Sequence, residues 1–160
     1  MSVHRYLLVI IAIFIFQACS NKGKDTSLEW KTIQDIEKIR NTSGLNKPMM
    51  IDVYTDWCKW CKVMDKETFT NKEVIDYINT HFYAVKFDAE QKENAVFNGQ
   101  SFAYQTSGRS GANMLAVNLL RGDLSFPSIV YLDKHFNIIQ VSPGYKTPEQ
   151  LLAELQKLVP

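Results

Sequence analysis

Residues 48–67 read PMMIDVYTDWCKWCKVMDKE. The run Pro48–Tyr54 is apolar and ends at a polar turn, a pattern that predicts a buried central strand. Asp52 is its single charged residue. A helix is expected from about Cys58 to Glu67. The stretch therefore places two cysteines, three residues apart, directly after a buried strand and at the start of a helix.

The chemistry of Cys58 and Cys61 follows from this helix start. Cys58 is expected at the positive end of the helix dipole, where unpaired backbone N–H groups stabilise a thiolate. Cys61 lies one turn further along the same face, close enough to form a disulfide with Cys58. Such surroundings lower the pKa of a cysteine from about 8.5 to roughly 7 or below. We therefore predict that Cys58 is the nucleophile of thiol–disulfide exchange and Cys61 the resolving thiol.

Helix caps and apolar runs predict the remaining elements, which begin near Leu28. In chain order we expect a strand at Leu28–Trp30, a helix capped at Thr32, a helix capped at Thr70, a strand at Phe82–Asp88, a hairpin about Asn98-Gly99, a loop at Ser107–Gly111, a helix at Asn113–Leu120, strands at Ser128–Leu132 and Asn137–Val141, and a helix capped at Thr147. Alternating elements that end in an antiparallel hairpin predict an α/β fold, with a mixed central sheet and helices on both faces.

Composition excludes several classes of protein. With 160 residues, 46% hydrophobic and 22% charged, the chain can bury a core and is too apolar to be wholly disordered. A net charge of +1 argues against nucleic-acid binding. His4, His81 and His135 form no metal-ligand spacing with the cysteines, and Lys62 stands where c-type haem attachment needs a histidine. We expect no bound metal and no cofactor.

The N-terminus has the order of a secretory signal. Arg5 precedes Leu7–Phe16, an apolar run of ten residues, whereas about 20 are needed to span a bilayer. The sequence Phe16-Gln17-Ala18-Cys19 resembles the bacterial lipobox, in which the peptide is cut before the cysteine and its thiol is lipidated. Plain secretion with a chance cysteine is the alternative.

These features predict three segments and a location. Residues 1–18 are expected to be a lipoprotein signal peptide, 19–27 a flexible tether from lipidated Cys19, and 28–160 one folded domain. The domain would then be lipid-anchored to a bacterial membrane in the cell envelope and would face the periplasm.

Around the cysteines, the segment Asp52–Lys62 resembles the active-site segment of thioredoxin-fold proteins. It is most similar to the thioredoxin-like domains typified by the C-terminal domain of DsbD-type disulfide interchange proteins. Further matches in the family's order are Met64–Asp88, Phe126-Pro127-Ser128 before a strand, and Gly144-Tyr145 before the last helix. The resemblance covers Trp30–Leu158 except for roughly residues 91–111. It implies a thioredoxin-like fold with a β-hairpin inserted before the strand that follows the family's cis-proline.

The resemblance also implies roles for single residues. Asp52 stands where thioredoxins keep a buried acid that relays a proton; the alternative is an ordinary strand acid near Lys86. Pro127, if cis, would place backbone beside Cys58 and dock an extended substrate; a trans bond is the alternative. Trp57, Trp60 and Phe126 are expected at the substrate surface, although the tryptophans can also simply pack. Met64 is favoured as a core residue over a ligand in a Cys-Cys-Met copper site.

Three functions remain in competition. The favoured one is a monomeric, membrane-tethered thiol–disulfide oxidoreductase that reduces disulfides of exported proteins. Because the chain has one dithiol and no nucleotide motif, a membrane reductase would have to supply its electrons. The second is a thioredoxin-fold module that binds or delivers a metal through the same dithiol. The third is a lipoprotein merely stapled by Cys58–Cys61, a reading weakened by the small loop that this disulfide closes.

The insertion either forms a rim for a partner or packs on the sheet edge.

Overall fold

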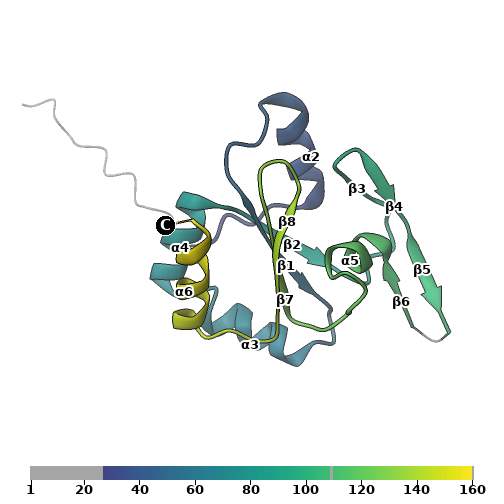
Figure 1. Cartoon of the computed structure of the whole chain (residues 1–160). Helices are drawn as coiled ribbons and strands as arrows, with labels where there is room; N and C mark the ends of the chain where they lie inside the picture. The colour runs from purple at the N-terminus through teal and green to yellow at the C-terminus, as the bar shows by residue number, and fades with distance from the viewer. Residues whose placement is uncertain (1–26, 109, 160) are drawn as a thin grey trace, which may run out of the picture.

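The computed structural model describes residues 27–108 and 110–159, which build an α/β fold around a four-stranded sheet (Figure 1). The predicted signal peptide, the predicted lipid attachment at Cys19 and all of the predicted tether except Ser27 lie outside the described residues. Within the described ranges, no helix combines the length and the apolar character that crossing a membrane requires.

The sheet has the strand order β2-β1-β7-β8. Its centre is β1 (Met49–Tyr54), which pairs in parallel with β2 (Tyr83–Asp88) and antiparallel with β7 (Ser128–Leu132). The last strand, β8 (Ile138–Pro143), is antiparallel to β7. Because β1 is covered on both faces, its sequence is a continuous apolar run rather than an alternation. The predicted mixed sheet is confirmed.

Helices cover both faces of the sheet, and alternate side chains of β1 point to different helices. On one face, α2 (Ile33–Thr42) and α5 (Met114–Leu119) contribute to a core that contains Ile51 and Val53. On the other, α3 (Lys59–Glu67), α4 (Lys72–His81) and α6 (Pro148–Leu158) pack with Met50. Asp52 has the same parity as Met50, so its side chain points to the face that α3 covers.

The predicted cap of α4 is wrong by one residue. The cap of α4 is Asn71, whose side chain accepts from the backbone N–H groups of Glu73 and Val74 at 3.0 and 3.2 Å, and not Thr70. Thr70 instead donates its hydroxyl to the Lys66 carbonyl at 2.6 Å. Both residue types suit a cap, so only the backbone path decides between them. The caps expected at Thr32 and Thr147 are confirmed, and each forms a capping box.

The predicted edge strand at Leu28–Trp30 is also displaced. No strand forms there, and Lys31 makes the single parallel bridge to Val85. Its backbone N–H donates to the Ala84 carbonyl at 2.7 Å, and its carbonyl accepts from the N–H of Lys86 at 3.1 Å. The chain turns into the cap of α2 at the next residue, which leaves no room for a longer strand.

The insertion between β2 and β7 contains two hairpins. The first, β3 (Ala95–Phe97) and β4 (Gln100–Phe102), turns at Asn98-Gly99, where both residues have the positive φ that this dipeptide tolerates. This hairpin is confirmed. The loop predicted at 107–111 is wrong, because β5 (Tyr104–Ser107) and β6 (Ser110–Asn113) form a second hairpin there. In Figure 1 the two hairpins lie beyond α5, on the opposite side from α4 and α6.

The first hairpin is fastened to α2. Ala95 and Phe97 are buried in the core beneath that helix. At the turn, the backbone N–H groups of Asn98 and Gly99 donate to the Glu37 carboxylate at 2.6 and 3.3 Å. Glu37 also forms an ion pair with Arg40 at 3.0 Å, so its buried charge is neutralised. The first hairpin therefore packs on α2 rather than on the sheet edge, and a rim for a partner stays a prediction.

Candidate functional site

The two cysteines form a disulfide at the N-terminus of α3. Cys58 is the N-cap residue, and its sulfur accepts from the backbone N–H of Cys61 at 3.1 Å. The Cα atoms of the pair are 5.3 Å apart, and the residues are only 4% and 3% exposed. The backbone N–H of Cys58 donates to the Thr55 carbonyl at 3.1 Å, which fixes the short turn after β1. Cys58 therefore lies where the helix dipole stabilises a negative sulfur.

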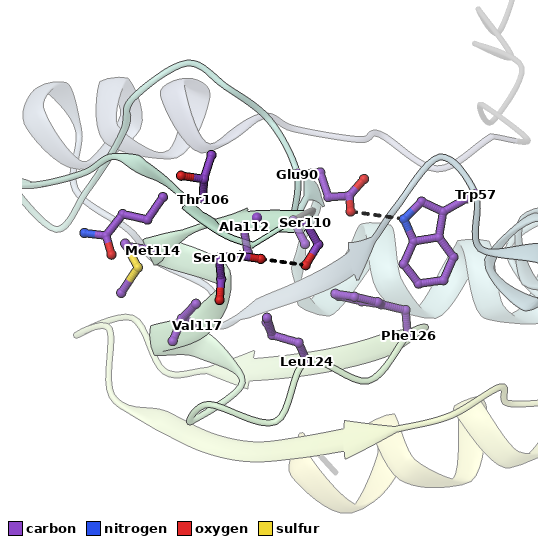
Figure 2. Close-up of a pocket in the computed structure, with 13 residues that line it drawn as sticks. Trp57, Glu90, Thr106, Ser107, Ser110, Ala112, Met114, Val117, Leu124 and Phe126 are labelled. Atoms are coloured by element: carbon purple, nitrogen blue, oxygen red, sulfur yellow. Dashed lines mark hydrogen bonds between the residues drawn. The ribbon is translucent and has the colours of Figure 1, made fainter.

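Two large aromatic side chains stand exposed beside the disulfide. Trp57 is 65% exposed and Trp60 59%, so neither is a core residue. The indole N–H of Trp57 donates to the carboxylate of Glu90 at 3.1 Å (Figure 2). The ring of Trp60 lies 5.5 Å from that of Tyr145, between centroids. Their part in a substrate surface stays a prediction, but exposure leaves them available for it.

The Phe126–Pro127 peptide bond is cis, the geometry that the resemblance implied. It lies next to the cysteines because Ser128, at the start of β7, pairs with Val53 of β1. The ring of Phe126 also meets that of Trp57 edge-on, with centroids 5.9 Å apart. The residue before the cis-proline thus contacts the residue before the first cysteine. Substrate docking by Pro127 stays a prediction.

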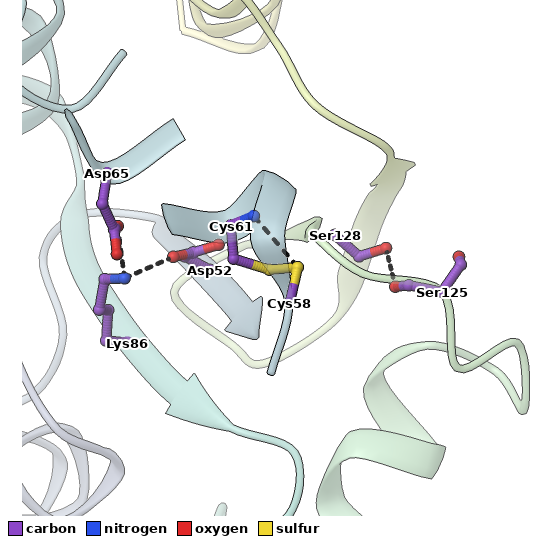
Figure 3. Close-up of a disulfide and its surroundings, with 7 residues drawn as sticks. All are labelled: Asp52, Cys58, Cys61, Asp65, Lys86, Ser125 and Ser128. Atoms are coloured by element: carbon purple, nitrogen blue, oxygen red, sulfur yellow. Dashed lines mark hydrogen bonds and ion pairs between the residues drawn. A yellow bond between two sulfur atoms is a disulfide. The ribbon is translucent and has the colours of Figure 1, made fainter. Parts of the chain in front are cut away.

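A buried ion cluster lies on the other side of the cysteines (Figure 3). Asp52 is 2% exposed, and its Oδ2 lies 3.1 Å from the Lys86 ammonium. The same ammonium contacts Asp65 of α3 at 2.5 Å, and Asp65 is the more exposed of the two acids. Among the described residues, no donor bonds the second Asp52 oxygen, and the buried hydroxyl of Thr55 also lacks a partner. In Figure 3 the Asp52 carboxylate is drawn between Lys86 and the cysteines.

The electrostatics of this cluster prepare Asp52 to exchange a proton near neutral pH. Burial raises the pKa of Asp52 to about 6, although the neighbouring Lys86 charge counteracts the rise. Burial also works against the charge of Lys86, but the carboxylates of Asp52 and Asp65 together leave its pKa above the ordinary value. Asp52 thus lies beside Lys86, as the alternative expected, and its role as a proton relay stays a prediction.

The structure gives no support for a third sulfur ligand. Met64 is 1% exposed and belongs to the core cluster with Met50 and Phe69. Within residues 27–108 and 110–159, no group of three or more His, Cys, Asp or Glu side chains is placed to hold a metal ion.

Several residues of the site were given no role in the sequence predictions. Asp65 was detectable in principle, because it follows Cys61 by four residues and so lies on the same face of α3. Glu90 and Tyr145 carry no local signal for their contacts with the two tryptophans, which arise from distant parts of the chain. Thr55 is an ordinary turn residue in sequence and becomes notable only through its burial.

Solved structures of other proteins share this fold. The chain is 26% identical to a thioredoxin-fold protein from Helicobacter pylori, with a TM-score of 0.56 over 71% of this chain and 69% of that one. A DsbH oxidoreductase shares the fold at 16% identity and a TM-score of 0.56, over 82% and 83% of the two chains.

Curated relatives match over a shorter segment. The thiol:disulfide interchange protein DsbD of Pseudoalteromonas atlantica is 32% identical over 69 residues, which are 42% of this chain and 12% of that protein. An uncharacterized protein of Caenorhabditis elegans, B0495.5, is 32% identical over 75 residues, 47% of this chain and 10% of its own length. The matched segments thus span about a tenth of these relatives. The family model Thioredox_DsbH, described as a protein of unknown function, DUF255, matches residues 19–157, and the chain therefore belongs to this thioredoxin-like family.

Proposed function

We propose that this protein is a thiol–disulfide oxidoreductase whose reactive pair is Cys58 and Cys61. One observation carries the proposal: the Cys58 sulfur is the N-cap of α3, in a disulfide with Cys61 and beside the cis Phe126–Pro127 bond. A helix N-terminus favours a thiolate at Cys58, the form in which cysteine attacks disulfides. The similarity to DsbD, a thiol:disulfide interchange protein by name, supports the same chemistry.

The reaction in the reducing direction has two steps. The Cys58 thiolate attacks one sulfur of a substrate disulfide, forms a mixed disulfide and releases the first substrate thiol. Cys61 then loses its proton and attacks the Cys58 sulfur, which forms the Cys58–Cys61 bond and releases the second substrate thiol. Two electrons pass from the protein dithiol to the substrate, and each departing sulfur takes up one proton.

Asp52 is the group that we assign to the proton of Cys61. Its pKa of about 6 keeps it mostly ionised at neutral pH, yet able to accept a proton. The ammonium of Lys86 links it to the more exposed Asp65, which gives the buried acid a polar route towards solvent. The unpaired oxygen of Asp52 leaves one acceptor position open for the Cys61 proton.

The direction and the location are further parts of the proposal. We infer a reductase tethered to the membrane through Cys19, facing the periplasm and acting on exported proteins with electrons from a membrane reductase. The supports are the lipobox-like sequence before Cys19 and the single dithiol in a chain without a nucleotide motif. Radiolabelled palmitate incorporation that disappears in a Cys19→Ala variant is the expected result for the anchor.

The redox potential of the Cys58–Cys61 pair tests the function directly. It is measured by equilibrating the protein with glutathione or dithiothreitol mixtures and trapping free thiols. A value of about −270 mV supports a reductant, whereas one of about −120 mV makes the protein a disulfide donor. A pair that exchanges with neither buffer and instead retains a stoichiometric metal after reduction would replace the enzyme with the metal-binding alternative.

A further inference from the structure

A groove of about 490 Å³ begins at Trp57 and Phe126, the residues that precede Cys58 and the cis-proline, and runs along the second inserted hairpin. Trp57 and Phe126 line the end next to Cys58 and the cis-proline. Figure 2 shows these two rings at one end and Thr106 and Met114 at the other. One end of the groove is therefore formed by the residues next to Cys58 and Pro127 in the chain.

The groove has an apolar floor from α5 and the chain that follows it. Val117 and Leu124 line it together with the Phe126 ring, and Leu124 is 41% exposed. The β5–β6 hairpin supplies the opposite wall. Register pairs Ser107 with Ser110 and Gln105 with Ala112, and all four side chains share one face because alternate residues of a strand do so. Ser107, Ser110 and Ala112 have small side chains, which leaves the groove open.

The back of the same hairpin is filled. Tyr104 packs across Gly111, where an added Cβ would lie 2.3 Å from the tyrosine hydroxyl. The ammonium of Lys92 sits 3.4 Å from the Tyr104 ring centroid, so this cation is engaged behind the wall. At the base, the N–H of Asn113 donates to the Ala89 carbonyl at 2.7 Å. The hairpin is thus supported from behind and anchored to the end of the sheet.

The disulfide end of the groove is negatively charged. Among the described residues that line the groove, Glu90 is the charged one. Its carboxylate accepts a hydrogen bond from the Trp57 indole. The Glu90 N–H donates to Asp88 at 2.9 Å, and exposed Asp56 precedes Trp57 in the chain. Burial is the main cause of a raised pKa at Asp88, and the charges of Asp56 and Glu90 add to it, while Lys92 opposes it.

We propose that this groove binds the polypeptide segment that flanks the reactive cysteine of a substrate protein, with a preference for a Lys or Arg side chain next to that cysteine. The inference rests on the proposed function, because it names the substrate class for the same site. The basic side chain would pair with Glu90 and Asp56, and an apolar side chain further along the segment would lie against Val117, Leu124 and Phe126.

Charge complementarity selects this occupant over an acidic or purely apolar one. A segment held through a mixed disulfide at Cys58 enters the groove beside Trp57, where the carboxylates lie. A basic group there satisfies Glu90 without displacing the indole, whereas an acidic group would meet like charge at the groove entrance.

The test compares three oxidants of the reduced full chain, purified in a mild detergent. The first two are matched peptides, Ala-Leu-Ala-Lys-Cys-Ala and Ala-Leu-Ala-Glu-Cys-Ala, each carrying thionitrobenzoate on its cysteine. The third is 5,5′-dithiobis(2-nitrobenzoate), which has no peptide to place in the groove. Each rate constant is read from the released chromophore and expressed relative to the third. A chain with Cys58→Ser and Cys61→Ser gives the contribution of Cys19.

The reference chain should react about twofold to fivefold faster with the Lys peptide than with the Glu peptide at low salt, and less so at high salt. Glu90→Gln keeps an oxygen for the Trp57 N–H but removes the charge, so this preference should fall towards one. Glu93→Gln, an exposed change outside the groove lining, should retain it.

A second pair of variants tests the space itself. Ser107→Trp places a large side chain in the groove and should lower the relative rates of both peptides by about threefold or more, since it excludes the segment. Gln100→Trp, on the exposed side of β4, is the matched control and should leave them unchanged.

The outcomes separate the two proposals. Equal peptide preferences in the reference and Glu90→Gln chains, or relative peptide rates unaffected by Ser107→Trp, overturn the groove while the reaction with the third oxidant upholds the oxidoreductase. A reference chain that reacts no faster than the double-serine chain with all three oxidants overturns both.

Discussion

The two sides of the Cys58–Cys61 disulfide are built in opposite ways. On the sheet side, Asp52 of the central strand β1 forms an ion pair with Lys86 of the edge strand β2. Asp52 is buried, and the pair reaches solvent through the partly exposed side chains of Lys86 and Asp65. On the outer side, Trp57 is exposed and borders a groove whose wall is an inserted hairpin. Because the buried side never meets a substrate, we expect it to set the rate with every substrate. The exposed side should set which substrate is preferred.

Removal of the Cys58 or Cys61 sulfur has the largest expected effect, because the reaction that both sides of the disulfide serve depends on it. Cys58→Ser should reduce thiol–disulfide exchange to the background rate with every oxidant, because the attacking thiolate is gone. Cys61→Ser should still attack, and should accumulate a mixed disulfide that is visible by mass spectrometry. Full activity in a Cys58→Ser chain would show that Cys58 is not the nucleophile, and the roles given to the two sides of the disulfide would have to be reassigned.

Asp52→Asn is the sharpest change on the buried side. It should slow the exchange by about tenfold to a hundredfold at neutral pH, because the acceptor for the Cys61 proton is lost. The rate of the resolving step, which in the reference chain rises through about pH 6 as Asp52 ionises, should lose that inflection. Stopped-flow kinetics across pH 5–8 measures it. The slowing should be equal for all substrates; a slowing confined to peptides would contradict the comparison.

The same substitution should raise stability at neutral and alkaline pH. The folded state holds a proton on Asp52 up to about pH 6, whereas the ordinary pKa is 3.8. Protonation of Asp52 therefore contributes to the unfolding free energy of the folded protein. This contribution is complete below the ordinary pKa and is lost as pH rises through about 6. A shift of this size corresponds to about 3 kcal/mol, which already includes the opposing attraction of Lys86.

Urea unfolding of the oxidised protein at pH 5 and pH 8 checks this expectation. The difference in unfolding free energy between Asp52→Asn and the reference chain should grow in favour of the variant at the higher pH. Asp123→Asn, at an exposed position, is the control for removal of a carboxylate. An identical difference at both pH values would show that Asp52 keeps its charge throughout this range.

On the outer side, Trp57→Phe should change substrate preference more than rate. The substitution keeps an aromatic ring near Phe126 but removes the hydrogen bond to Glu90. Rates with peptide disulfides should fall by about twofold to fivefold relative to a small aromatic disulfide, because the groove loses a fixed end wall. Parallel rate measurements with both kinds of oxidant decide it, and an equal fall for both would assign Trp57 to the buried side's role.

The buried side could largely be predicted from the sequence, because it arises from local patterns. The apolar run of β1 makes a lone Asp52 conspicuous, and the spacing of Cys58 and Cys61 fixes them on one helix turn. Lys86 was weighed as a neighbour of Asp52, but the shared contact with Asp65 depends on how α3 lies on β2. No linear spacing relates those two elements.

The outer side could be predicted only in part, because one of its two hairpins packs into the core and the other does not. The first hairpin has a turn that accepts positive φ at Asn98 and Gly99 and two strand residues that reach the core. The second hairpin, residues 104–113, is polar and mostly exposed, so it lacks the apolar alternation by which strands are recognised. Its tyrosine packs on its own glycine rather than on the core. A strand without a buried face looks like a loop.

The smallest expected effect tests whether Asp65 belongs with the buried side. In the folded protein, burial is the largest cause of the raised pKa of Asp52, and the negative charge of Asp65 raises this pKa further. The positive charge of Lys86 lowers it. Asp65→Asn should therefore lower the pKa of Asp52 and move the pH–rate inflection downward, with the plateau rate and the ratio between peptide substrates unchanged. Carboxyl carbon NMR of Asp52 reports the pKa directly. A changed peptide ratio with an unmoved inflection would place Asp65 on the substrate side, and the division between the two sides of the disulfide would fail.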